Sequence, residues 1–169
     1  MEDPSSIKIE HWHMKDFMPF LVRLSKESDR GAVLMSTGYL EKVLKDILVA
    51  YFIEGSSSDA LFENGALATF SARSAACHAL GLISDDEFHD IQLIRKIRNY
   101  LAHEMHSTFE DPQVVDRCKL LRLKAHDYGD VVVGTTGQFQ TAAVGILNRL
   151  INRAHYVSLK RSKYGEWQF

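Results

Sequence analysis

The sequence has little proline, little cysteine, no long apolar run and no large excess of either charge. Only Pro4, Pro19 and Pro112 occur, so residues 20–111 contain no proline. Two cysteines are too few for a disulfide-stapled scaffold, and we expect both thiols to be reduced. The longest apolar run, residues 47–53, is too short to cross a bilayer, and the acidic start opens no signal peptide. We therefore expect a cytoplasmic protein with no membrane segment.

What is present suits one folded domain. The chain has 169 residues, of which 46% are hydrophobic and 25% charged. A formal net charge of −2 argues against a general polyanion binder, which needs a large excess of Lys and Arg. The charge is uneven, because residues 149–169 carry +4 and the rest carry −6. The basic residues of that segment are Arg149, Arg153, Lys160, Arg161 and Lys163.

Apolar residues recur at helical spacing, which predicts an all-α fold, a single compact helical bundle of about six helices. The expected helices span residues 13–28, 29–53, 69–80, 85–106, 111–123 and 138–159. Residues 56–64 are predicted to be a loop with one helical turn, and residues 124–137 an ordered loop with one extended stretch. We expect residues 1–12 to be a flexible leader and residues 13–169 to form the single domain.

Five local signals predict where helices start, stop or bend. Gly81 ends one helix, and Ser84 with Glu87 has the spacing of a capping box for the next. Asp111 before Pro112 marks another start. Thr135 and Gln138 repeat the capping-box spacing before the last helix, and Pro19 predicts a late start or a kink in the first.

The helix over residues 85–106 carries charges within its apolar stripe. The stripe is formed by Ile91, Ile94, Ile97, Leu101 and Met105. Asp90 and Arg98 project within it, and buried charges are costly unless they are paired. We predict that both are buried and paired, with Arg73, His78 and Glu41 as candidate partners. Arg95, Asn99, His103 and His106 lie on a polar flank, and we expect Asn99 and His103 to border a cleft or a subunit interface.

Two interpretations of this helix stay open. It is either a core helix with one ion pair and a solvated face, or part of a site. The stretch from Arg98 to His103 resembles the Arg–His motif of the higher eukaryotes and prokaryotes nucleotide-binding (HEPN) domains. For a ribonuclease, that resemblance implies metal-independent catalysis by Arg98, Asn99 and His103. On a straight helix Arg98 and His103 project about 140° apart, so they would have to converge through a dimer or a distorted turn.

A longer resemblance covers the middle of the chain. Residues 65–73, 79–84, 88–90 and 94–103 resemble the central block of the mannitol operon repressor family, in the same order and at similar spacing. This resemblance implies an all-helical bacterial cytoplasmic protein that represses sugar-alcohol uptake genes and forms a homodimer.

The residues themselves favour repression without direct reading of DNA. The only tight helix–turn–helix surrounds Gly81, and the helix after it opens with Asp85, Asp86 and Glu87. Three acids there would repel phosphate, so we predict contacts with another protein, such as a regulator or a transport component. An immunity protein that blocks a toxin is a further interpretation, because acid-rich surfaces suit that role.

We predict no cofactor and no metal. His11 and His13 are a weak ligand pair in a leader, and His103 and His106 have the wrong spacing for a zinc helix. Cys77 and His78 diverge on a helix, so they are no nucleophile–base pair. The glycine-rich residues 129–134 lack the lysine of a phosphate loop.

Overall fold

The fold is an all-α bundle, as the periodicity predicts. We describe it from a computed structural model, in which residues 14–104 and 106–166 are placed. These residues form eight helices, against about six predicted, and no strand beyond one isolated bridge. The helices are α1 (Met14–Leu24), α2 (Asp29–Tyr51), α3 (Ser56–Glu63), α4 (Phe70–Ala79), α5 (Asp85–His103), α6 (Pro112–Lys119), α7 (Thr135–Leu150) and α8 (Arg153–Ser158).

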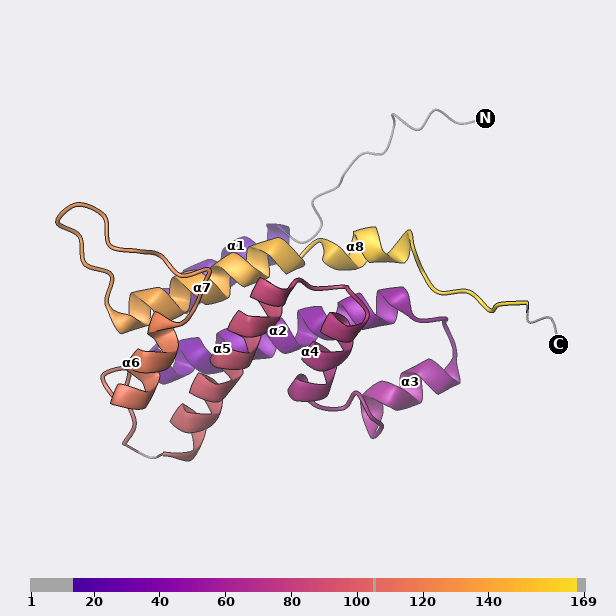
Figure 1. Cartoon of the computed structure of the whole chain (residues 1–169), viewed down its shortest axis with the longest axis horizontal. Helices are drawn as coiled ribbons and strands as arrows, with labels where there is room; N and C mark the ends of the chain where they lie inside the picture. The colour runs from indigo at the N-terminus through magenta and orange to yellow at the C-terminus, as the bar shows by residue number, and fades with distance from the viewer. Residues whose placement is uncertain (1–13, 105, 167–169) are drawn as a thin grey trace, which may run out of the picture.

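Helix α2 is the centre of the bundle. It contacts α1, α4, α5, α7 and α8, and Figure 1 shows it running behind α4 and α5. Its predicted stripe is buried from Leu40 to Leu48, with Leu40, Leu44 and Ile47 fully enclosed. Ser28 caps its start by accepting from the Gly31 amide. Within the described ranges, no helix is both long enough and apolar enough to span a bilayer.

Helix α1 buries the face that its sequence predicts. Phe17 and Leu24 are buried, and Phe20 and Leu21 are half-buried against the core. Pro19 lies inside the helix. The helix ends four residues before the predicted limit, because Ser28 already caps α2. The predicted leader, residues 1–12, lies outside the described residues.

Helix α3 replaces the predicted loop over residues 56–64. Phe62 is buried in the core and lies 6.1 Å from Phe52, centroid to centroid. The Ser58 hydroxyl donates to the Ile53 carbonyl oxygen at 2.5 Å, which ties the start of α3 to the chain that leaves α2. Burial of one aromatic side chain therefore stabilises a helix for which the serine-rich sequence gives no periodic signal.

The predicted start and stop signals around α5 are confirmed. Gly81 has a φ of 68°, the left-handed conformation that glycine tolerates. Ser84 and Glu87 form the capping box, each side chain accepting from the other's backbone N–H. The helix ends at His103 instead of residue 106. At this end, the carbonyl oxygen of the next residue, Glu104, accepts a hydrogen bond from the Arg30 guanidinium. Ile91, Ile94, Ile97 and Leu101 are buried as predicted, whereas Met105 lies outside the described residues.

The last predicted helix is two helices. Helix α7 starts at Thr135, three residues earlier than predicted, and Gly134 is its N-cap residue. The predicted Thr135–Gln138 capping box is wrong, because no side chain caps this end. The helix ends at Leu150, and α8 starts at Arg153. Arg153 donates to the Leu82 carbonyl oxygen at 2.8 Å, so the α7–α8 junction is fixed by contacts with the α4–α5 turn.

Helix α6 is shorter than predicted. Pro112 is its first residue, as expected. Asp111 precedes it but does not cap it, because the carboxylate accepts instead from the Tyr100 hydroxyl at 3.1 Å. The helix ends at Lys119, and the next residues turn toward α5.

Candidate functional site

Asp90 is the most enclosed charged side chain of the described residues. It is buried, and its carboxylate accepts from the Arg122 amide at 2.9 Å and the Leu123 amide at 2.8 Å. The predicted burial of Asp90 is confirmed. The predicted pairing with Arg73 or His78 is wrong, because backbone N–H groups take the place of a cation. Asp90 thus anchors the chain after α6 to α5.

Arg98 is exposed, so its predicted burial is also wrong. Its Nη1 donates to Asn99 Oδ1 at 3.1 Å. The Cα position does lie on the apolar side of α5, but a long arginine side chain can reach water along the edge of such a stripe. Asn99 is half-buried, His103 is exposed, and among the described residues no hydrogen bond joins His103 to Arg98. A catalytic role for these three residues stays a prediction.

Arg73 and Glu41, two of the candidate partners for the α5 charges, pair with each other at 3.1 Å. Arg73 Nε also donates to the Leu67 carbonyl oxygen at 2.8 Å, and Nη2 to that of Ala68 at 3.2 Å. Arg73 therefore fixes the segment before α4 and takes no part in a cluster with Asp90.

Arg95 is part of a polar link between α4 and α5. Its guanidinium donates to Gln92 Oε1 at 3.0 Å, and Gln92 Nε2 donates to the Ser74 hydroxyl at 2.9 Å. The six residues predicted as one polar cluster thus lie in separate places. Asp90 binds backbone amides after α6, Arg73 binds the segment before α4, and Arg95 bonds to Gln92. Arg98, Asn99 and His103 lie near the end of α5.

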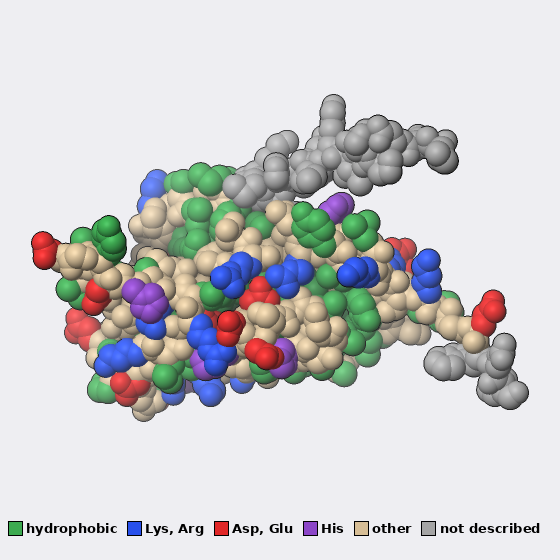
Figure 2. Space-filling model, turned by 45° about the horizontal axis from the view of Figure 1, so that its top comes forward, with side chains coloured by type: hydrophobic (Ala, Val, Ile, Leu, Met, Phe, Trp, Pro, Cys, Tyr) green, Lys and Arg blue, Asp and Glu red, His purple; other side chains and the backbone are tan. Residues whose placement is uncertain are grey.

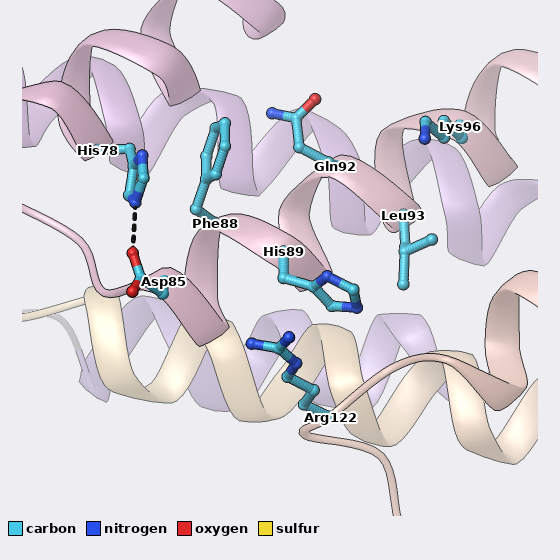
Figure 3. A pocket seen from close by; sticks show the side chains of 8 residues that line it. All are labelled: His78, Asp85, Phe88, His89, Gln92, Leu93, Lys96 and Arg122. Carbon is cyan, nitrogen blue, oxygen red and sulfur yellow. Dashed lines mark hydrogen bonds and ion pairs between the residues drawn. The ribbon is translucent and has the colours of Figure 1, made fainter.

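A groove beside α5 contains residues that the motifs did not indicate. It has a volume of about 330 Å³ and is lined by His78, Asp85, Phe88, His89, Gln92, Leu93, Lys96 and Arg122. Figure 3 shows His78 beside Phe88, with its Nε2 toward Asp85 at 2.8 Å. The two rings stack at 4.2 Å between centroids.

Most polar groups of this groove already have partners within the chain. His89 Nε2 lies 3.2 Å from the Leu120 carbonyl oxygen, and Arg122 pairs with Asp86. Acidic and basic groups are both present, and no nucleophile lies beside a base. The groove thus presents paired acidic and basic groups to a polar partner. No spacing in the sequence brings His89 and Arg122 together, since they meet only through the fold.

The Arg98 side chain lines a second, smaller pocket. This pocket has a volume of about 170 Å³ and lies between the start of α2 and the end of α5. Its walls are Arg30, Val33, Leu34, Arg98, Leu101 and Ala102. Arg30, which no sequence motif indicated, donates to the Glu104 carbonyl oxygen and to the Ser107 hydroxyl.

The cysteines and the acidic residues form no reactive or metal-binding group in the part of the chain that the structure describes. No three His, Cys, Asp or Glu side chains come together there as ligands. Cys77 and Cys118 are buried, and this burial raises the pKa of each thiol to about 12. Both thiols are therefore protonated at neutral pH and inert as nucleophiles. His11 and His13 lie outside the described residues.

The segment between α6 and α7 forms a small hairpin that projects from the bundle (Figure 1). Tyr128 and Val131 exchange both backbone hydrogen bonds, at 3.1 and 3.0 Å, around Gly129, whose φ is 56°. Glycine at the first central position is typical of a type II′ hairpin turn. Asp127 Oδ1 accepts from the Val133 amide at 2.7 Å, which closes the base. The predicted ordered loop with an extended stretch is confirmed.

The tip of this hairpin is apolar and exposed. The exposed fractions are 86% for Tyr128, 66% for Val131 and 78% for Val132. Isolated exposed apolar residues are common, but three on one projecting and hydrogen-bonded turn form a surface suited to contact with another molecule. We call Tyr128, Val131 and Val132 the hairpin tip.

The turn before α5 does not present a basic recognition helix. Asp85 and Asp86 are exposed in the first turn of α5, and Glu87 is buried in an ion pair with Arg153 at 2.9 Å. On the face drawn in Figure 2, acidic and basic side chains are interspersed, without a field of one sign. The first turn of α5 therefore carries exposed carboxylates, at the residues where the sequence places them.

Comparison with known proteins assigns the family. The model of the mannitol repressor family matches residues 32–131. The chain belongs to the mannitol repressor family. The match runs from the first turn of α2 to the hairpin tip, and so it includes the groove, the Asp90 anchor and most of the Arg98 pocket. No curated protein and no solved structure matches the chain.

Proposed function

We propose that this protein represses genes for the uptake of a sugar alcohol by contacting another protein, without reading DNA itself. Membership of the mannitol repressor family supports the regulatory role. The observation that carries the mechanism is the acidic first turn of α5. The helix that follows the Gly81 turn exposes the carboxylates of Asp85 and Asp86. The basic side chains next to them, His78 and Arg122, are paired with these carboxylates, so among the described residues the turn presents no free basic surface to a phosphate backbone.

The basic C-terminal segment gives little support to DNA binding. Arg153 is engaged by Glu87 and by the Leu82 carbonyl oxygen. Arg161 pairs with Glu54 and donates to the Ala50 carbonyl oxygen at 3.2 Å. Internal pairing of this kind leaves Arg149, Lys160 and Lys163 as the exposed cations of the segment. Three scattered cations supply only weak, salt-dependent attraction to a polyanion.

The hairpin tip is the surface that best supports contact with a protein. Interfaces are enriched in aromatic and apolar side chains at their centre, and a turn fixed by hydrogen bonds loses little entropy when it binds. The Ala125 amide donates to the Thr141 hydroxyl at 2.8 Å, which holds the hairpin against α7. The tip is thus presented in a defined position.

A reporter experiment tests the proposal. The gene is deleted from its host, and wild-type or variant copies are supplied while transcription of the sugar-alcohol uptake genes is measured. We expect the double variant Val131→Asp, Val132→Asp to lose repression, because charged side chains oppose an apolar contact. The matched control, Lys160→Gln with Lys163→Gln, should repress like the wild type.

Two results would contradict the proposal. One is loss of repression in the Lys160, Lys163 variant, which would indicate contact with a polyanion. The other is repression by the tip variant at the wild-type level. Thermal unfolding of each purified variant, compared with the wild type, separates a lost contact from a lost fold.

A further inference from the structure

The pocket between α2 and α5 brings two arginines to one apolar hollow. Arg30 comes from the first turn of α2 and Arg98 from the last half of α5, 68 positions apart in the chain. Its volume of about 170 Å³ equals that of about six water molecules. Arginine side chains from two helices line this small space, and each carries a permanent positive charge, which favours an anion.

The Arg98 guanidinium has N–H donors that are available to a ligand. The hydrogen bond to Asn99 uses one N–H of its guanidinium and orients the group. Among residues 14–104 and 106–166, no carboxylate lies within ion-pair distance of Arg98. Its charge is therefore uncompensated by an ion pair within the described chain, although it stands at the edge of an apolar stripe.

Arg30 is held in place by the end of α5. Its Nη2 donates to the Glu104 carbonyl oxygen and, at 3.3 Å, to the Ser107 hydroxyl. The guanidinium thereby offsets the partial negative charge at the C-terminus of this helix, which would otherwise oppose an anion nearby. It also adds a second positive charge to the wall of the pocket.

The floor and one wall of the pocket are apolar. Val33 and Leu101 are buried, whereas Leu34 is 52% exposed beside them. A bound hydrocarbon group would cover Leu34 and remove apolar area from water. A free inorganic anion gains nothing from that surface, so the walls select a ligand with both an anionic head and an apolar body.

We propose that this pocket binds a small organic anion, in which a carboxylate or phosphate head contacts Arg98 and a short hydrocarbon body lies on Leu34. The bidentate geometry of a guanidinium suits either head group. The inference is independent of the proposed repression, because neither the hairpin tip nor the acidic turn of α5 takes part in it.

A titration of the purified full-length protein tests the inference. Hexanoate and butyl phosphate are the two anionic probes, hexanamide is the neutral probe, and methyl NMR signals report where each binds. We expect one or both anions to shift the methyl signals of Val33, Leu34 and Leu101 in a saturable manner. Hexanamide and inorganic phosphate should bind much more weakly, because each lacks one half of the recognised chemistry.

Variants on α5 make the result specific. Arg98→Gln should raise the Kd of the bound anion about ten- to a hundredfold, the loss expected for a charge-assisted hydrogen bond. The control, Lys96→Gln, removes the same charge from an exposed site on α5 outside this pocket and should leave Kd within about twofold.

Three outcomes overturn the inference. The first is the absence of saturable shifts at Val33, Leu34 and Leu101 with both anions. The second is an unchanged Kd in Arg98→Gln when its amide spectrum shows the native fold. The third is hexanamide binding as tightly as hexanoate, which would show that the charge is not recognised.

Discussion

At the scale of single residues, Asp90 shows how a buried carboxylate is held by backbone groups. Its two oxygens accept the amides of Arg122 and Leu123 at the point where the chain leaves α6. Backbone N–H groups are fixed donors, so a carboxylate that accepts several of them is stabilised without a cation. The side chain joins two segments that are distant in the sequence.

Replacement of this anchor should be costly. We expect Asp90→Ala to lower the free energy of unfolding by about 3 kcal/mol, since it leaves buried amides without an acceptor. Urea unfolding followed by circular dichroism measures the change. Asp85→Ala is the control, because Asp85 is exposed, and a loss of similar size there would refute the special role of Asp90.

The two thiols give a prediction for alkaline pH. Burial raises the pKa of Cys77 and Cys118 from 9.0 to about 12 in the folded chain. The unfolded state releases these protons first, so the thiols' contribution to stability is complete below about pH 9 and is lost as the pH rises toward 12.

Replacing both cysteines with alanine should flatten the fall in stability between pH 9 and 12, as measured by urea unfolding at each pH. The native protein should also resist alkylation by iodoacetamide at neutral pH, and the urea-unfolded protein should react. Rapid modification of the native protein would show that the thiols are not enclosed.

The sequence predicts which face of a helix a residue lies on better than it predicts which group that residue will contact. Helical spacing correctly places Asp90 in the core, but the partners are backbone amides more than thirty positions away, for which no pattern exists. The same spacing places Arg98 on the apolar side, yet the length of its side chain carries the charge to water. Arg30 meets Arg98 only because α2 crosses the end of α5.

At the scale of elements, an ion pair joins the start of α5 to the start of α8. Glu87 is buried, completes the capping box, and binds Arg153, whose side chain is partly exposed. Arg153→Ala should lower the free energy of unfolding by about 2 kcal/mol, because it leaves a buried carboxylate without its cation. Arg149→Ala, at an exposed position of α7, should change it by less than about 0.5 kcal/mol. Chemical denaturation measures the free energy of unfolding of both variants. An equal loss in the Arg149 and Arg153 variants would contradict a stabilising role for the Glu87–Arg153 ion pair.

The hairpin depends on glycine at one position. Gly129→Ala places a side chain in a left-handed conformation, which costs about 1 kcal/mol. We expect faster hydrogen exchange of the Val131 amide as the turn opens. Gly134→Ala is the control, because Gly134 has an ordinary φ of −64° and open space around it. Unchanged exchange in the Gly129 variant would show that the turn does not hold the hairpin.

Most boundaries with local signals are predicted well, with the Thr135–Gln138 capping box as the exception, and elements without such signals are predicted poorly. Ser84, Gly81 and Pro112 act within one turn of the chain, and all three mark the helix boundaries that they predict. Helix α3 depends on burial of Phe62, and the break before α8 depends on contacts of Arg153. Both are tertiary effects, which spacing along the chain does not contain.

At the scale of the whole molecule, the proposed protein contact rests on the distribution of charges and of exposed apolar side chains. The helix after the Gly81 turn opens with acids, Arg153 and Arg161 of the basic segment form ion pairs, and the hairpin projects from the bundle (Figure 1). The all-α class, the family and the acidic turn were accessible from the sequence. The tip was not, because exposure of Val131 and Val132 is a property of the assembled bundle.

The most direct test of repression through a protein contact is the binding of the purified full-length protein to its target promoter. Fluorescence anisotropy is measured at physiological salt, with random-sequence DNA as competitor. We predict weak binding that random DNA displaces and that falls steeply as salt is raised. Tight binding that prefers the promoter sequence and survives the competitor would contradict the account.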